Sequence, residues 1–170
     1  MAAESGPGLE LNVGAKVVYA AHGTARVTAR EIRTILGVEQ EVVVLETDQG
    51  LVVTLPVARA LERLRPIATR ADVECVQETL RQKGDADPGH WEKRFKRRQA
   101  IMASGELLGL AEIVRDGIRQ NSEGGPPKLS ARERQLYVQA REFLAHEIAA
   151  ACGLDLAAAD TWIEQQAASA

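Results

Sequence analysis

The chain has 170 residues, of which 45% are hydrophobic and 26% are charged, and its formal net charge at pH 7 is −3. This hydrophobic content supports one modest core or two small ones, which excludes an intrinsically disordered chain. The slightly acidic balance excludes nucleic-acid binding by overall charge, so any such binding requires a local basic patch.

The two cysteines, Cys75 and Cys152, stand alone, without a CxxC pair or a histidine at metal-ligand spacing. We therefore expect reduced thiols in a cytoplasmic protein. The first seven residues contain an acid and no apolar core, which predicts no signal peptide. No apolar run approaches the roughly 18 residues of a membrane span, so we expect no membrane partner.

The first half of the chain has the pattern of short β-strands joined by tight turns, after a flexible lead-in at residues 1–10. Pro56 is expected to end the last of these strands. Four strands within about 45 residues predict a small curled barrel or sandwich. The strands are expected at residues 15–20, 24–35, 41–46 and 51–55, with turns at 21–23, 37–38 and 47–50.

After residues 61–66 the hydrophobic period becomes helical. Ser130 and Glu133 form a capping box at the start of the longest predicted helix, and Asp155 is the expected cap of the last one. Helices are expected at residues 71–83, 91–103, 106–119 and 130–151 and after Asp155, with loops at 84–89 and 121–128. Their expected core residues are Val73, Val76, Thr79, Leu80, Leu107, Leu110, Ala111, Val114, Ile118, Leu136, Ala140, Phe143, Leu144 and Ile148.

The most unusual segment is Asp-Pro-Gly-His-Trp-Glu-Lys-Arg-Phe-Lys-Arg-Arg at residues 87–98. Asp87 fits a helix N-cap and Pro88 fits the first helical position. Between Glu92 and Arg98 five cations accompany a single anion. An aromatic ring beside cations suits a protein that holds phosphates and presses a wedge against base pairs. The second interpretation is structural: Trp91 pairs with Phe95 in a core, and the cations form a solvated helix face.

No catalytic constellation is recognisable. The three histidines, His22, His90 and His146, fall in a turn, at a helix start and within a helix, and none belongs to a triad or metal-ligand pattern. The glycines match no phosphate-binding loop, and Trp162 is expected to pack in a core. We therefore expect no enzyme activity, no cofactor, no metal and no small-molecule substrate.

Four motifs occur in order between about residues 11 and 150. They are Val-Gly-Ala-Lys-Val-Val-Tyr-Ala-Ala-His-Gly at 13–23, Arg-Thr-Ile at 33–35, His-Trp-Glu-Lys-Arg-Phe-Lys at 90–96, and Ala-Glu-Ile-Val-Arg-Asp at 111–116 with Leu-Ser-Ala-Arg-Glu-Arg at 129–134. Any one alone is weak, and the set is specific. With them the chain resembles the bacterial CarD/CdnL family of RNA polymerase-binding transcription regulators.

The resemblance implies an α+β protein, with a small Tudor-like β-barrel domain at residues 11–66 and an all-helical domain of about five helices at 67–168. In this family the β domain docks on the RNA polymerase β subunit. Arg33 matches a family arginine at that interface, and Thr34 and Ile35 would extend an exposed strand for edge pairing. Thr54 occupies the position of a second family arginine. A plain surface charge is the other interpretation of Arg33.

The resemblance also implies promoter DNA as a partner of the helical domain, at the upstream edge of the transcription bubble. The residue at the position of Trp91 wedges into the minor groove there and slows bubble collapse, which stabilises the open complex. The positions of Lys93, Arg94 and Lys96 hold the DNA backbone. Two further basic residues are expected to join them: Arg97 in the same patch, and Arg134 at a matching position near the start of a later helix.

The sequence departs from the family pattern at three positions. Thr54 replaces a charged anchor, Ala20 replaces a proline, and Ala15 replaces an acid. These changes leave open an alternative function, in which a diverged paralogue acts as a protein-interaction adaptor that binds a partner through its β domain and does not bind DNA.

Overall fold

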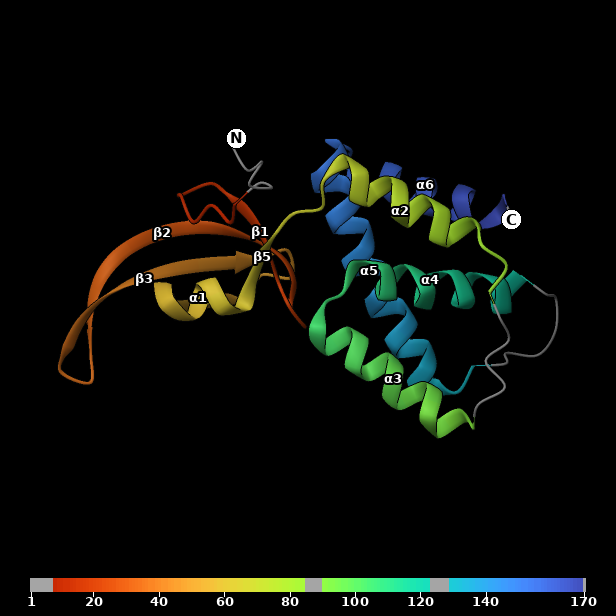
Figure 1. Cartoon of the computed structure of the whole chain (residues 1–170), viewed down its shortest axis with the longest axis horizontal. Helices are drawn as coiled ribbons and strands as arrows, with labels where there is room; N and C mark the ends of the chain where they lie inside the picture. Colours follow the sequence, from red (N-terminus) through yellow and green to blue (C-terminus); the bar gives the residue numbers. More distant parts are fainter. Residues whose placement is uncertain (1–7, 85–89, 123–128, 170) are drawn as a thin grey trace, which may run out of the picture. The chain divides into compact units, whose positions relative to one another are not determined.

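The computed structural model describes residues 8–84, 90–122 and 129–169, and divides into two compact units (Figure 1). The first unit spans Met1–Ile67 and the second spans Ala68–Ala170. The expected cap at Asp87 and Pro88 and most of the expected loop at 121–128 lie outside the described residues.

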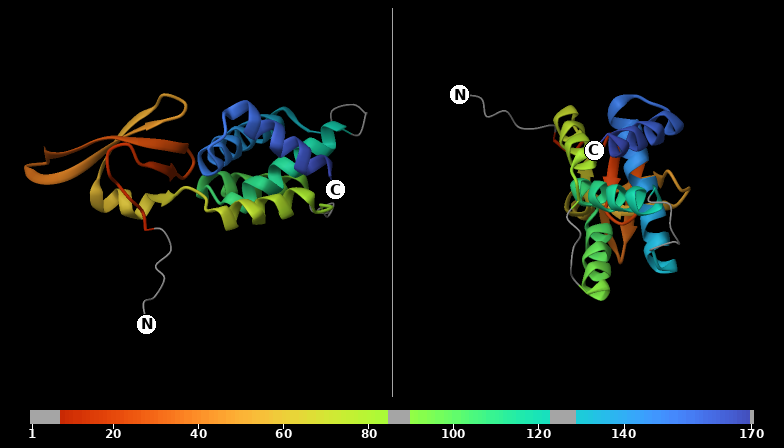
Figure 2. Two further views of the ribbon diagram at one scale, coloured as in Figure 1. Left: turned by 90° about the horizontal axis from the view of Figure 1, so that it is seen from above. Right: turned by 90° about the vertical axis from the view of Figure 1, so that its right-hand side faces the viewer.

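The first unit is a five-stranded antiparallel sheet in the order β4-β3-β2-β1-β5. The order begins and ends with unpaired edges, so the sheet is twisted but is not closed into the expected barrel (Figure 2). The predicted fold class, a β domain followed by a helical domain, is confirmed. The strands are β1 (Lys16–Tyr19), β2 (Gly23–Ile35), β3 (Val38–Thr47), β4 (Val52–Pro56) and β5 (Leu64–Pro66).

A short helix, α1 (Val57–Arg63), and strand β5 follow Pro56 directly, and the sequence analysis missed both. Pro56 occupies the N-cap position of α1 without any side-chain cap, so it ends one element and begins the next. Ala60 on α1 is fully buried. The helix thus closes the small core of this unit, which consists of Leu11, Val17, Ala25, Val27, Val43, Leu45, Ala60 and Leu64.

A β-bulge interrupts the pairing of β2 with β3 between Val27 and Ala29. Before the bulge Val27 lies opposite Leu45, and after it Ala29 lies opposite Val44. Because one extra residue reverses the alternation of faces, the strand reads only loosely as period two in the sequence. Beyond the bulge β2 and β3 continue together as a long hairpin, which Figure 1 shows curving away from the other strands.

Residues Leu36 and Gly37 form the two-residue turn of this hairpin, since Ile35 pairs with Val38. Both have positive φ, 52° and 79°, as a type I′ turn requires. Leu36 is 99% exposed. The tip therefore places an apolar side chain in solvent at a position where Asn or Gly is usual.

The second unit contains five helices in its described part, as expected. Helix α5 is the longest, and its central residues Ala140, Leu144 and Ile148 are fully buried. The capping box of Ser130 and Glu133 is confirmed at its start. The helices are α2 (Arg70–Arg81), α3 (Trp91–Ser104), α4 (Leu107–Ser122), α5 (Ala131–Cys152) and α6 (Leu156–Ala168). Trp162 packs against the core from α6, as expected.

Helices α4 and α5 approach each other closely at Gly117. A Cβ built on this glycine would lie 2.0 Å from Cδ2 of Tyr137, so only glycine lets the ring of Tyr137 lie against the backbone of α4. The buried carboxylate of Glu147 on α5 accepts a hydrogen bond of 3.1 Å from the backbone N–H of Ala68. Among the helices that the structure describes, none has the length and apolar character needed to cross a membrane.

Candidate nucleic-acid and protein interfaces

The basic segment forms helix α3, which begins at Trp91, at the start of the expected range of 91–103. His90 is the N-cap residue and makes no side-chain cap hydrogen bond. Gly105, in the left-handed conformation, ends the helix. The expected cap at Asp87 lies outside the described residues and stays a prediction.

Trp91 lies on the same helical stripe as Phe95 and Arg98, but it is 50% exposed. Phe95 is half-buried and packs against the core of the helical unit. Met102 is the buried residue of α3. The apolar stripe thus extends beyond the packed part of the helix, and its last ring is left partly in solvent. The core interpretation fits Phe95 better than it fits Trp91.

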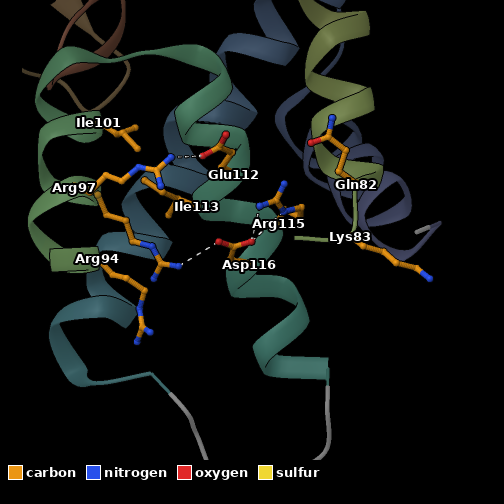
Figure 3. A pocket seen from close by; sticks show the side chains of 10 residues that line it. Gln82, Lys83, Arg94, Arg97, Ile101, Glu112, Ile113, Arg115 and Asp116 are labelled. Atoms are coloured by element: carbon orange, nitrogen blue, oxygen red, sulfur yellow. Dashed lines mark hydrogen bonds and ion pairs between the residues drawn. The ribbon is translucent and has the colours of Figure 1, made fainter. Parts of the chain in front are cut away.

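The cations of α3 separate into two sets. Three arginines follow helical spacing on one flank, Arg94, Arg97 and Arg98, and line a pocket against α4 (Figure 3). The two lysines, Lys93 and Lys96, are exposed and lie outside that lining. The cations that are continuous in the sequence therefore belong to two surfaces, an arginine surface that lines the pocket and a lysine surface outside it.

The lysine and arginine in the first turns of α3 work against helix stability. The N-terminal end of a helix carries partial positive charge, so a cation there is unfavourable by about 0.3–1 kcal/mol at low ionic strength. Lys93 and Arg94 occupy this end, and the last turn, where cations would be favourable, has none. Stability does not account for the position of these charges.

Arg98 has a structural role that the sequence analysis missed. Its Nη2 lies 3.3 Å from Oδ2 of Asp116, and its Nη1 lies 4.0 Å from Oε1 of Glu133. The other oxygen of Asp116 pairs with Arg115 at 2.9 Å. Arg115 also donates to the Thr79 carbonyl oxygen at 3.4 Å. This network joins α2, α3, α4 and α5, and its sequence separations gave no signal.

Arg134 lies in the first turn of α5 and is exposed. It donates to the Leu129 carbonyl oxygen at 3.5 Å. Its neighbour Glu133 approaches Arg98 of α3, and α3 packs against α5. The structure therefore brings the start of α5 to α3, within the same unit.

In the β unit, Arg33, Thr34 and Ile35 lie at the distal end of β2, where the pairing partner is β3. Arg33 and Thr34 are exposed, and Ile35 is half-buried. The side chain of Arg33 pairs with Glu31 two residues earlier, on the same face of the strand. Strand β1 covers β2 only as far as Arg26, so the distal edge of β2 is open for pairing in the described sheet.

Thr54 is exposed on the edge strand β4 and lies opposite Val44, which in turn lies opposite Ala29. Since residues two apart share a face, Thr54 is on the same face of the sheet as Arg33 and Ile35, and Thr34 is on the other. Three apolar side chains near the hairpin tip are also strongly exposed, which the sequence analysis did not single out: Ile32 at 71%, Leu36 at 99% and Val38 at 62%.

Comparisons with known proteins agree with the division of the chain into a β unit and a helical unit. Residues 75–164 match the family model of the CarD C-terminal domain, and residues 11–68 match that of the CarD-like/TRCF RID domain, an RNA polymerase-interacting domain. The chain is also 28% identical over 141 residues to the “Putative transcription factor YdeB” of Bacillus subtilis (strain 168), covering 80% of this chain and 88% of that protein. The chain belongs to the CarD family and is a transcription regulator.

Proposed function

We propose that the protein docks on the RNA polymerase β subunit through its β unit and stabilises the promoter open complex through helix α3. The observation that carries this proposal is the exposure of Trp91, which is 50% at the start of a helix where Glu92 is followed by Lys93 and Arg94. Folding does not require the ring to be in solvent or the cations to be at this helix end.

The division of labour follows from charge. The chain has a net charge of −3, so its DNA affinity rests on a few side chains and is weak and sensitive to salt. These side chains are Trp91, Lys93, Arg94, Lys96, Arg97 and Arg134. Docking on polymerase supplies a high effective concentration at the upstream edge of the bubble, where the strands are separated. The cations hold the backbone there, and the ring contacts an unstacked base step.

The docking surface in this proposal is the distal part of β2 with its neighbours. Arg33 and Ile35 share a face with Thr54, and the free edge of β2 offers backbone groups for pairing with a strand of the partner. Thr54 supplies no charge at this surface. We expect Thr54→Arg to strengthen binding to the isolated β subunit and Arg33→Glu to weaken it, each measured by titration. No effect from either change would place docking elsewhere.

The experiment that tests the DNA role is the lifetime of a promoter open complex after competitor challenge, with the cognate polymerase. The wild-type protein is expected to lengthen the lifetime. The lifetime with Trp91→Ala should be roughly fivefold shorter than with the wild type, which corresponds to about 1 kcal/mol of stacking. Trp91→Phe keeps a flat ring and should retain part of the effect.

Val138→Ala is a matched control, because Val138 is 56% exposed and belongs to α5 and not to the basic helix. It should leave the lifetime at the wild-type value, and polymerase binding should be equal for all three variants. Equal lifetimes for Trp91→Ala and wild type would reject the wedge.

The second candidate is an adaptor that binds a protein through the β unit and makes no DNA contact. The exposed apolar side chains of Ile32, Leu36 and Val38 favour a protein partner under either function. An adaptor would show no salt-dependent binding to duplex DNA that Lys93→Glu weakens. A DNA-contacting helix would lose roughly one unit of salt slope for each phosphate-contacting lysine removed.

A further inference from the structure

A polar pocket of about 390 Å³ lies within the helical unit, between α3, α4 and the end of α2 (Figure 3). Helix α3 contributes three arginines to its lining, and Arg115 comes from α4. Figure 3 shows Arg97 of α3 and Glu112 of α4 reaching toward each other across the pocket. The charged lining residues are Lys83, Arg94, Arg97, Arg98, Arg115, Glu112 and Asp116.

Positive charge dominates this lining, with five cations against two carboxylates. A third carboxylate, Glu133, approaches Arg98 at 4.0 Å from outside the lining. Even with this carboxylate included, cations outnumber anions. A concave site with an excess of one sign of charge focuses the field and concentrates counter-ions. The charge of the lining therefore favours an anion over a cation.

The floor of the pocket is held in place by its own carboxylate. Oδ2 of Asp116 lies 3.3 Å from Nη2 of Arg98, and Oδ1 of Asp116 lies 2.9 Å from Nη2 of Arg115. The side chains of these arginines are only 15% and 9% exposed. Two guanidinium groups fixed around one anionic group form a preorganised positive surface, so a ligand does not have to order them.

The side chain of Arg97 is held far less strongly than the side chains of Arg98 and Arg115. Among the described residues it pairs with Glu112, at 3.5 Å, and the two side chains are 66% and 41% exposed. A guanidinium carries five N–H donors in a planar fork that matches phosphate oxygens. An exposed pair of this length contributes little, so the exchange of Glu112 for a phosphate oxygen meets a small barrier.

We propose that this pocket binds a compact oligophosphate anion, such as a pyrophosphate or triphosphate group, with Arg94 and Arg97 contacting its oxygens above the floor of Arg98 and Arg115. A concave site suits a small anion with concentrated charge. Duplex DNA presents its phosphates along a convex surface, which the exposed Lys93 and Lys96 meet more readily. The proposal does not depend on the wedge role of Trp91.

The test is isothermal titration of the full chain with sodium triphosphate at constant ionic strength, with sulfate as the comparison anion. The double variant Arg94→Gln, Arg97→Gln should weaken triphosphate binding about tenfold or more. The matched control is Lys93→Gln, Lys96→Gln, which removes the same charge from the same helix outside the pocket and should change the affinity by less than about twofold. Absent triphosphate binding in the wild type, or equal losses in the two double variants, would overturn the proposal.

A change of opposite sign sharpens the test. Glu112→Gln removes the carboxylate that competes for Arg97 and should tighten triphosphate binding about threefold. Unchanged or weaker binding would remove Arg97 from the site. Circular dichroism of each variant checks that the helical unit is folded.

A DNA arm separates the two possible sources of phosphate. Because Arg94 and Arg97 belong to both proposed sets, bound triphosphate should compete with a labelled duplex for the wild-type protein. If the arginine double variant loses duplex binding and the wild type binds no triphosphate, these arginines are DNA contacts and the oligophosphate site is rejected.

Discussion

Helices α3 and α5 pack against each other in the same unit, but their sequences serve different ends. Helix α5 begins with a complete capping box, ends at a left-handed Gly153, and is buried along much of its length. Helix α3 has no side-chain cap, buries Met102, and places Trp91 and two cations at its weakest end. The caps and the burial of α5 stabilise that helix, whereas the first turns of α3 contain residues that do not stabilise it.

The largest expected contrast is between the cores of the two helices. Leu144 on α5 is 0% exposed, so Leu144→Ala should lower the free energy of unfolding by about 2–5 kcal/mol through lost burial and a residual cavity. Trp91→Ala removes a half-exposed ring and should lower it by less than about 1 kcal/mol. Urea unfolding followed by far-ultraviolet circular dichroism measures both. A loss of several kcal/mol for Trp91→Ala would show that the ring is a packing residue.

The caps provide a contrast of intermediate size. Ser130 accepts a hydrogen bond from the backbone N–H of Glu133, and Ser130→Ala should lower stability by about 1 kcal/mol. His90 makes no such bond, so His90→Ala should change stability by only a few tenths of a kcal/mol. Thermal unfolding midpoints compare the two. Equal shifts would mean that α3 has a cap of comparable strength.

The ion pairs give the smallest contrast, and it depends on pH. Arg141 of α5 binds Asp160 through two nitrogens, at 2.7 and 2.8 Å, and these hydrogen bonds hold the pKa of the Asp160 carboxyl below its usual range. Stability from this pair is complete above the unfolded-state pKa of about 3.9 and is lost as the pH falls through the lower folded-state pKa. Because Asp160 is partly exposed, the contribution at neutral pH should be below about 1 kcal/mol.

Asp160→Asn should therefore lower the unfolding midpoint at pH 7, and the difference from wild type should shrink below about pH 4. Glu112→Gln serves as its counterpart on the α3 side, since it removes a single 3.5 Å pair and should leave the midpoint unchanged within a few tenths of a kcal/mol. A difference for Asp160→Asn that persists at pH 2 would contradict the electrostatic explanation.

Local patterns in the sequence predicted much of the fold. Alternation and turn residues located the strands, and helical spacing with the Ser130 capping box located the helices. Local patterns did not predict elements that follow one another without a loop. Pro56 was interpreted only as the end of a strand, so α1 and β5 after it were missed. The bulge after Val27 was also hidden, because one inserted residue reverses the faces without any change in composition.

The candidate sites could be predicted only in part from local sequence patterns. The sequence located the aromatic and basic helix, but the exposure of Trp91 depends on how far neighbouring helices cover α3. The pairing of Arg98 with Asp116 and of Arg115 with the Thr79 carbonyl joins residues on different helices, which spacing along one helix cannot reveal. For this reason the separation of the arginines from Lys93 and Lys96 emerged only in three dimensions.

The turn at Leu36 has a consequence for the energetics of the hairpin tip. A leucine with a φ of 52° is strained by roughly 1 kcal/mol, and its side chain, 99% exposed, recovers nothing from burial. A sequence optimised only to fold would place asparagine or glycine there. The energetics of folding therefore do not explain the leucine, whose exposed side chain is available for contact with another molecule.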